Sequence, residues 1–365
     1  MKINRKEKGY LPPLFVFSFV LALLSYLLLL ICKQSFALSD FLNRYALQYI
    51  RLALAHLTSY IPFSLFELLF LLLLPTATIL IVVLVKFVRS KKGRIRSLLS
   101  VISMICLVLT SHIYTLGIAY HTTPLANKLS LDADGKISAD SLYDTTVLVR
   151  DRVNELSLKL TYSEGESRMP YSFKALSEHI SAAYDVLERD YPIFDNFSSY
   201  AKPVRHSSIM SDMGISGVYG FITGEANINM EYPDYNLPFV VAHEFAHQRG
   251  FARENEANFI AYLVCISSAD PYVRYSGYLN MYEYLASALY RTDKELYATA
   301  LSDLSLNARA DIIASNAITA AHSDSLLNKL MDRVNDTYLK ANGTEGVISY
   351  SYVVRLTVAY HNSID

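Results

Sequence analysis

Apolar residues are concentrated in the first third of the sequence, in three long runs at about residues 11–32, 61–88 and 98–120. Each run contains the ~20 predominantly apolar residues that an α-helix needs to cross a bilayer. The first run is longer than the apolar core of a signal peptide, and no clean small-residue cleavage site follows it. The pattern therefore predicts three membrane-spanning helices within a membrane region of residues 1–120.

Basic residues around these runs predict the orientation of the helices. Two dense clusters of Lys and Arg precede the first run and separate the second from the third, whereas the longer connection between the first and second is sparsely basic. Because cytoplasmic loops carry the excess of Lys and Arg, the N-terminus is expected inside and everything after residue 120 outside. The clusters are Lys2, Arg5, Lys6 and Lys8, and then Arg89, Lys91, Lys92, Arg94 and Arg96.

The connection between the first two runs, residues 39–60, is amphipathic at helical spacing. Two interpretations stay open: this helix lies along the outer membrane surface, or it packs against the soluble domain. A lone acid near the outer end of the second run, Glu67, is expected to reach water at the interface. The apolar positions of the amphipathic segment are Phe41, Tyr45, Tyr49, Leu52 and Leu57.

Residues 121–365 have the composition of one globular domain. Helical periodicity predicts helices over residues 140–160 and 171–190, and again from 237 to about 339 with breaks near 270–271 and 302–307. Residues 346–361 are compatible with a helix or a strand. The Gly-containing segment 214–224 and the alternating segment 226–230 predict two short strands with a turn near Gly224. The expected fold is mainly α with a small β portion (α+β).

Charge and cysteine usage exclude several classes of function. The formal net charge is −1 and the chain has no long basic stripe outside the membrane region, so nucleic acid is not expected as a partner. Cys32, Cys106 and Cys265 lack the spacing of a zinc ribbon or a redox motif and are expected as buried thiols without disulfides. A transporter is disfavoured because three unbroken spans offer no pathway.

The strongest chemical signal is the sequence His-Glu-x-x-His at His243, Glu244 and His247. On a helix, positions i and i+4 share a face, so both imidazoles can reach one metal ion. Glu244 projects beside them and can take a proton from a water on that ion. The flanking residues are apolar, which predicts a buried helix in which unpaired imidazoles and a carboxylate would be costly.

Local signals delimit this helix. Asn236 is the expected N-cap, Pro238 falls in the first turn, where its missing N–H costs nothing, and Gly250 follows as a stop. Gly250 also allows the chain to turn and send a second helix back towards the metal. Glu254 would lie in the first turn of that helix, and Glu256 roughly 200° further around it, so only one of the two can readily face the site.

The two pieces together, His-Glu-x-x-His and Glu-x-Glu-Ala-Asn, resemble the zincin metallopeptidases whose third ligand is a glutamate, as in the CAAX-prenyl-protease and heat-shock membrane protease group with its Glu-x-x-Ala-Asp. The resemblance implies Glu254 as the ligand, with Glu256 as the alternative. Asn258 stands where that group has Asp and is expected to orient a ligand histidine. Only six residues, 248–253, separate His247 from Glu254, fewer than in typical glutamate zincins.

The layout of three spans followed by His-Glu-Phe-Ala-His-Gln-Arg-Gly-Phe also resembles an uncharacterised bacterial family of membrane proteins with a predicted zincin domain. That family carries no established substrate. In a different zincin class a third histidine ligand follows the motif, but Arg253 occupies its position here and cannot bind a metal.

These observations predict a multi-pass zinc metallopeptidase of the bacterial cytoplasmic membrane, with an extracytoplasmic zincin-like domain at residues 121–365. One Zn²⁺ per chain is expected on His243, His247 and Glu254, with Glu244 as general base. Lipid bilayer and a peptide or protein near the outer membrane surface are the expected partners, and residues 226–230 are expected to pair with extended substrate. The alternative is a non-catalytic binding or sensor module. Candidates for stabilising the carbonyl oxygen are Tyr350, Tyr352, Arg355 and His361.

Overall fold

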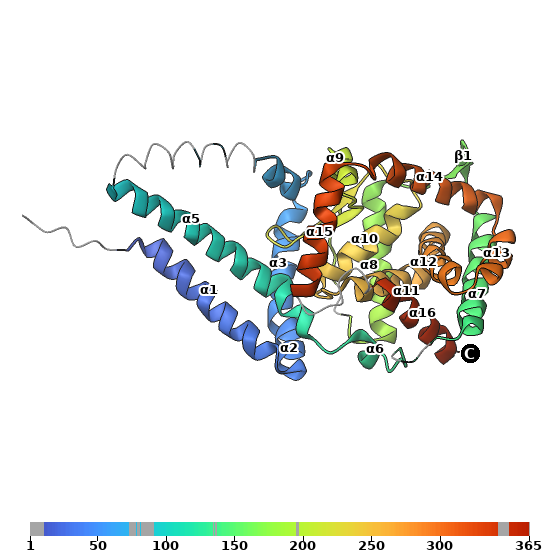
Figure 1. Ribbon diagram of the computed structural model, residues 1–365, viewed down its shortest axis with the longest axis horizontal. Coiled ribbons are helices and arrows are strands. Elements are labelled where there is room, and N and C mark those ends of the chain that lie inside the picture. The colour runs from blue at the N-terminus through green and yellow to red at the C-terminus, as the bar shows by residue number, and fades with distance from the viewer. Residues whose placement is uncertain are drawn as a thin grey trace, which may run out of the picture.

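A long two-helix arm projects from a helical domain in the computed structural model (Figure 1). The arm consists of α1 (Pro13–Cys32) and α5 (Lys91–His112), which lie side by side and run in the same direction towards the domain. The structure is mainly helical with a small sheet portion, as predicted. The residues that it describes are 11–72, 78, 81, 91–133, 135, 137–194, 197–341 and 350–364.

The arm buries small and polar side chains between its helices and exposes large apolar ones. The buried hydroxyls bond to carbonyls of their own helix, as in Ser25 Oγ to Leu21 O at 2.7 Å, so packing leaves them satisfied. Within the described residues two helices, Pro13–Cys32 and Ile95–His121, are long and apolar enough to cross a membrane, rather than the three predicted. Half of the predicted second span, 61–88, lies outside the described residues. The buried seam is formed by Ser18, Ser25, Cys32, Ser103, Cys106 and Thr110.

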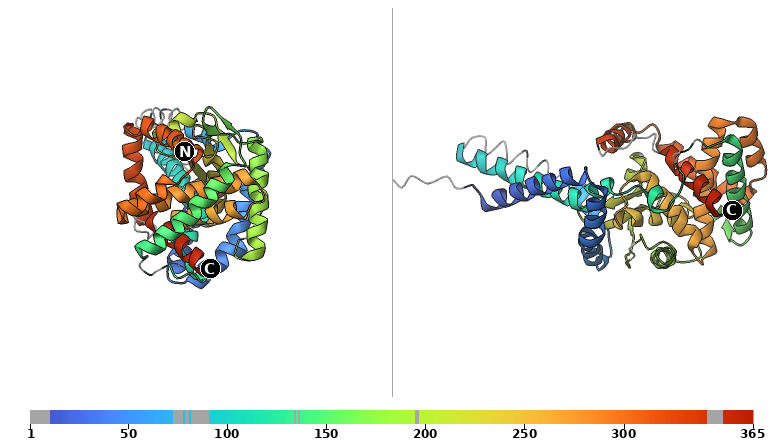
Figure 2. Two further views of the ribbon diagram at one scale, coloured as in Figure 1. Left: turned by 90° about the vertical axis from the view of Figure 1, so that its right-hand side faces the viewer. Right: turned by 90° about the horizontal axis from the view of Figure 1, so that it is seen from below.

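A continuous helical run crosses the domain end of the arm (Figures 1 and 2). It contains α2 (Phe36–Leu42), the π-helical turn η1 (Asn43–Leu47) and α3 (Gln48–Ser59), so the amphipathic helix predicted over residues 39–60 forms. One face of the run packs against the domain, with Arg51 and Ala55 almost fully buried.

The domain core lies between helices that surround the largely buried α11. The predicted helices at 140–160 and 171–190 are confirmed as α7 and α8, and serine hydroxyls of Ser138 and Ser172 cap their first turns. The last segment is a helix rather than a strand. These core helices are α7 (Ala139–Ser157), α8 (Phe173–Asp190), α10 (Asn236–Gln248), α11 (Glu254–Ser267), α12 (Pro271–Thr292) and α16 (Tyr350–Ile364).

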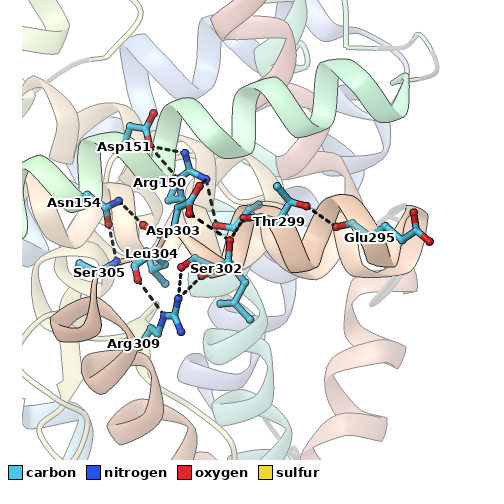
Figure 3. A network of polar contacts seen from close by, with 12 residues as sticks. Arg150, Asp151, Asn154, Glu295, Thr299, Ser302, Asp303, Leu304, Ser305 and Arg309 are labelled. Atoms are coloured by element: carbon cyan, nitrogen blue, oxygen red, sulfur yellow. Dashed lines mark hydrogen bonds and ion pairs between the residues drawn. The ribbon is translucent and has the colours of Figure 1, made fainter.

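Polar contacts fix the predicted break near residues 302–307 against α7 (Figure 3). Arg150 pairs with Asp303 at 3.2 Å, while Asn154 accepts from the Ser305 N–H at 2.8 Å and donates to the Asp303 carbonyl at 2.8 Å. These bonds satisfy backbone groups that the break leaves without helical partners.

The remaining helices and turns are shorter or lie further out. The outer helices are α13 (Lys294–Ser302), α14 (Leu306–His322) and α15 (Leu326–Ala341). The shorter segments are η2 (Ile113–Gly117), η3 (Ala119–His121), α6 (Leu125–Lys128) and α9 (Ser207–Asp212).

A three-stranded sheet covers one side of α10, in the order β3-β5-β4. The strands are β3 (Lys202–Val204), β4 (Gly217–Gly220) and β5 (Glu225–Asn229), and a separate hairpin joins β1 (Tyr162–Ser163) to β2 (Glu166–Ser167). The predicted antiparallel pair with a turn near Gly224 is confirmed as β4 and β5, and Gly224 has φ +72°.

The position of β5 contradicts one prediction. Residues 226–230 were expected to pair with an extended substrate, but β5 is the central strand of this sheet, with β3 parallel on one side and β4 antiparallel on the other. Its backbone groups are therefore already used by its neighbours. The alternating pattern identified a strand, but β4 is the strand that lies at the edge beside α10.

The start of the helix at residues 65–72 is fixed to the central strand. The buried Glu225 carboxylate accepts from the backbone N–H groups of Leu65 at 3.1 Å and Phe66 at 2.9 Å, which satisfies the first turn of that helix. Glu67 accepts from the backbone N–H groups of Arg205 and His206, at 3.1 and 2.8 Å. The expectation that Glu67 simply reaches water was therefore incomplete, because this acid joins the membrane region to the domain.

Candidate active site

Helix α10 presents the His-Glu-x-x-His sequence, and its first turn differs from the prediction. Tyr235 occupies the N-cap position and Asn236 is already the first helical residue, without a side-chain cap. The Tyr235 hydroxyl instead donates to Glu283 of α12 at 2.9 Å, which anchors the start of α10 by a tertiary contact. Pro238 lies in the first turn, as predicted.

Side chains just after the motif hold the other end of α10. Gln248 donates to the Gly224 carbonyl at 2.7 Å, which ties the helix to the turn between β4 and β5. The fully buried Arg249 donates to the Phe197 carbonyl at 2.7 Å, and its guanidinium lies 4.2 Å from the centre of the Tyr184 ring. Burial lowers the pKa of Arg249 to about 10. Sequence reasoning did not identify these two residues as positioning groups.

The structure brings His243, His247 and Glu254 together. One donor atom from each lies within 4.8 Å of the others. The two Nε2 atoms are 3.0 Å apart, and the Glu254 carboxylate lies 3.2 Å from His243 Nε2 and 3.5 Å from His247 Nε2. The i, i+4 spacing on α10 and the first residue of α11 thus produce one convergent set of nitrogen and oxygen donors.

The turn between α10 and α11 makes the short spacing to Glu254 possible. Gly250 has φ +92°, a conformation that side chains other than glycine rarely adopt, and α11 begins four residues later. His247 Nδ1 lies 2.8 Å from the Phe251 carbonyl in the same turn. Because that oxygen can only accept, Nδ1 donates to it, which leaves Nε2 as the ring nitrogen that faces His243 and Glu254 and is available to a metal.

The other acid of the second motif, Glu256, points elsewhere. It pairs with Arg253 at 2.8 Å and accepts from the Leu125 N–H at 2.9 Å. Arg253 also donates to the carbonyls of Tyr120 at 2.8 Å and Thr122 at 2.7 Å. The predicted divergence of Glu254 and Glu256 around the helix is therefore observed. Asn258, one turn beyond Glu254, lines the same cavity as the triad.

Glu244 is almost fully buried beside the triad. Its Oε2 has no hydrogen-bond partner among the described residues. Burial raises the pKa of this carboxyl, and the nearby His243 and His247 oppose the effect. The absence of a Cβ at Gly217 in β4 makes room for the Glu244 side chain, since a Cβ there would lie 2.6 Å from its Oε1.

The electrostatics of the triad favour an ionised acid and a basic imidazole. Burial lowers the pKa of His247, but attraction to Glu254 outweighs it and raises the pKa to about 9. Burial raises the pKa of Glu254, but His247 and His243 lower it well below its usual range. The site therefore holds negative charge on Glu254, as a ligand for a cation requires.

The triad opens into a cavity of about 660 Å³. Its walls come from α10 and α11 with the triad, from residues 213–219 at and before the edge strand β4, from α12, and from the end of the arm with η2 and η3. Two residues of α15, Met331 and Val334, also line it. From the end of the arm the lining residues are His112, Leu116 and Tyr120.

Three of the C-terminal candidates for a carbonyl stabiliser are not brought to this cavity. Tyr352, Arg355 and His361 lie on α16, away from the described lining residues, and the side chain of Tyr350 lies outside what the structure describes. His361 Nε2 lies 2.8 Å from the Tyr262 hydroxyl in the core, because α16 packs against α11 and α12 outside the site. The phenols that do line the cavity are those of Tyr120, Tyr219, Tyr232 and Tyr284.

Comparison with known proteins identifies a family without assigning a role. A family model described as "Protein of unknown function (DUF3810)" matches residues 43–358. A search of curated proteins and a search of solved structures each found no match. The matched region includes the helical run that crosses the arm, the sheet, the triad and most of α16.

Proposed function

We propose that this chain, which belongs to the DUF3810 family, is a membrane-anchored zinc metallopeptidase with a zincin-like site. The observation that carries the proposal is the convergence of His243, His247 and Glu254 on one point of the cavity, with Glu244 beside them. Two imidazoles and a carboxylate are a ligand set that zinc takes in hydrolytic enzymes, where a fourth position stays open.

Two features support the fit of a metal to these residues. The hydrogen bond to the Phe251 carbonyl orients the His247 ring so that Nε2 faces His243 and Glu254. The buried Oε2 of Glu244 lacks a partner among the described residues, and a buried carboxylate oxygen without a partner is costly unless it serves a ligand or water. Both features agree with a cation and a water in the cavity.

The proposed chemistry follows from where the protein groups lie. Zinc held by His243, His247 and Glu254 would supply a Lewis acid and would lower the pKa of a bound water towards ~7. Glu244, beside the triad, would take a proton from the water that adds to the peptide carbonyl and return it to the amine nitrogen when the C–N bond breaks. The edge strand β4, which contacts α10 beside Glu244, offers backbone groups to an extended substrate. Asn258 lines the same cavity, which supports a role in orienting a ligand histidine.

The cavity wall supports a substrate close to the membrane. His112, Leu116 and Tyr120 line the cavity, and all three belong to the candidate span Ile95–His121. A peptide or protein segment bound there lies within a few turns of the bilayer. The distribution of Lys and Arg supports a domain on the outer side of the cytoplasmic membrane, with the N-terminus inside.

Elemental analysis of the purified full chain tests the metal site. About one zinc per chain is expected in the wild type. His243→Ala and Glu254→Gln are expected to lose it, whereas Glu244→Gln keeps it. Glu256→Gln is the matched control, because it makes the same substitution two residues away on an acid that faces Arg253. Zinc loss from Glu256→Gln with retention in Glu254→Gln would contradict the assignment of the ligand.

Cleavage of a peptide library, followed by mass spectrometry, tests the reaction. The wild type is expected to generate new peptide termini, and Glu244→Gln is expected to generate none while it still holds zinc. Stoichiometric zinc without any cleavage would instead favour a non-catalytic binding or sensor module. The absence of stoichiometric zinc from the wild type would reject the metallopeptidase and leave a membrane-tethered binding or sensor module.

A further inference from the structure

The helical run that crosses the arm carries a row of exposed aromatic and apolar side chains. Three of them follow one another at intervals of four residues: Phe41, Tyr45 and Tyr49 are 58, 58 and 59 % exposed. Leu57 and Tyr60 continue the row, at 66 and 73 % exposed. We name these five residues the aromatic row.

Contacts on the opposite side of the run show which way the aromatic row points. Asn43 donates to the Gly250 carbonyl at 3.1 Å, and Arg51, only 1 % exposed, packs against the same glycine. Tyr45 follows Asn43 by two positions and Tyr49 precedes Arg51 by two, so each lies roughly 200° around the helix from the residue that touches the domain. The aromatic row therefore points away from the domain.

The side away from the domain is the side from which the arm projects. The run lies crosswise between the arm and the domain in Figure 1 and in the right-hand view of Figure 2. It is joined closely to the arm, because α1 ends at Cys32 and α2 begins at Phe36. The outer surface of the arm is apolar and both of its helices fall within candidate membrane spans. Lipid that surrounds the arm would therefore extend as far as the aromatic row and contact it.

We propose that the aromatic row is a membrane-interface surface that lies at the boundary between the headgroups and acyl chains of the bilayer. Tyr suits this position because its ring is apolar and its hydroxyl remains near water. A second copy of the chain is a poorer occupant, because the projecting arm stands on the side that such a copy would have to approach.

This surface also connects the bilayer to the candidate active site. The run that carries the aromatic row contacts the Gly250 turn through Asn43 and Arg51, and that turn precedes Glu254. Seating the run in the interface consequently fixes the height of the cavity above the lipid. The membrane surface itself does not depend on zinc or on peptidase activity, so it can be tested separately.

The sequence contains no tryptophan, which makes a direct test possible. Tyr45→Trp and Tyr49→Trp each introduce a single fluorophore into the aromatic row of the full chain. Tyr290→Trp is the matched control: Tyr290 is 50 % exposed, near the end of α12 that joins α13 at the far side of the domain. Each variant is reconstituted into phosphatidylcholine vesicles, with or without bromine on the acyl chains near the headgroups.

Brominated lipid is expected to reduce tryptophan emission about twofold for Tyr45→Trp and Tyr49→Trp, because the row lies at the acyl boundary. It should leave the emission of Tyr290→Trp unchanged. The proposal would be overturned if bromine quenched the emission of both row variants no more than that of the control. A second copy of the chain that covered the row and shielded it from lipid would give that result. Thermal unfolding midpoints equal to that of the wild type establish that each variant is folded. Because two positions of the row are tested, one variant that fails to fold still leaves the other to decide.

Discussion

Replacement of Gly250 by alanine should damage both the stability of the domain and the candidate metal site. Gly250 has φ +92°, and a Cβ at this position would lie 2.4 Å from Arg51 Nη2 and 2.8 Å from Asn43 Oδ1. The Arg51 guanidinium is the end of a flexible side chain, but it is buried and donates to the Asn43 carbonyl at 2.9 Å. It cannot move aside without losing that bond.

The size of the effect follows from two separate costs. A non-glycine residue in this backbone conformation costs about 1–2 kcal/mol. Displacement of tightly packed buried groups costs about 1–3 kcal/mol more. Gly250→Ala is therefore expected to lower the free energy of unfolding by about 2–5 kcal/mol. Gly165→Ala is the matched control, because Gly165 has φ +90° and no atom of the described residues lies within 4 Å of its added Cβ. This control should show the backbone cost alone.

The assay is denaturant unfolding of the full chain in detergent, combined with zinc titration. The altered turn also carries Phe251, whose carbonyl holds His247, so zinc affinity of Gly250→Ala should fall roughly 10–100-fold. Gly165→Ala should bind zinc like the wild type. The reasoning would be refuted if both alanine variants lost the same stability and Gly250→Ala kept wild-type zinc affinity.

Three further substitutions test other contacts. Burial raises the pKa of Glu283 from 4.5 to about 7, so ionisation of this acid lowers the free energy of unfolding as pH rises from 4.5 to 7. Glu283→Gln should match the wild type near pH 4 and be up to about 3 kcal/mol more stable at pH 8 by denaturant unfolding. Gly217→Ala should reduce kcat/KM on any cleaved peptide about 100-fold while zinc content is retained, because the new Cβ would displace Glu244; wild-type kinetics would contradict this. Gly277→Ala should lower the unfolding free energy by about 1–3 kcal/mol, since its Cβ would lie 2.4 Å from Cys265 Cβ between α12 and α11, and an unchanged Tm would refute that packing argument.

Local patterns predicted the elements that local physics determines. The apolar repeat over residues 140–160 was sufficient to predict α7, because the pattern of an amphipathic helix is encoded within a few turns. The strands of β4 and β5 were predicted for the same reason, since a short turn with Gly224 joins them. The burial of Cys265, at 0 % exposed, also agreed with its apolar surroundings.

Elements that depend on distant partners were not predictable in this way. β3 has only three residues and exists as a strand because it pairs in parallel with β5, which lies more than twenty residues later. That pairing also made β5 the central strand and so excluded it from binding substrate. Similarly, an N-cap role for Asn236 was a sound local expectation, but the contact of Tyr235 with Glu283 begins the helix one residue earlier.

The choice between Glu254 and Glu256 is the clearest case in which tertiary contacts complete a local rule. Helical geometry required the two acids to diverge, but it did not state which would face the histidines. Arg253 determines which acid faces the histidines, because it pairs with Glu256 and turns that acid away from the site. The Arg253 side chain is itself oriented by its hydrogen bonds to the carbonyls of Tyr120 and Thr122. Those carbonyls lie where the third apolar run ends, so the segment that completes the membrane region also orients the candidate ligand. Residue 120 therefore marks the change from an apolar to an ordinary composition along the chain, but residues from both sides of this boundary form the site.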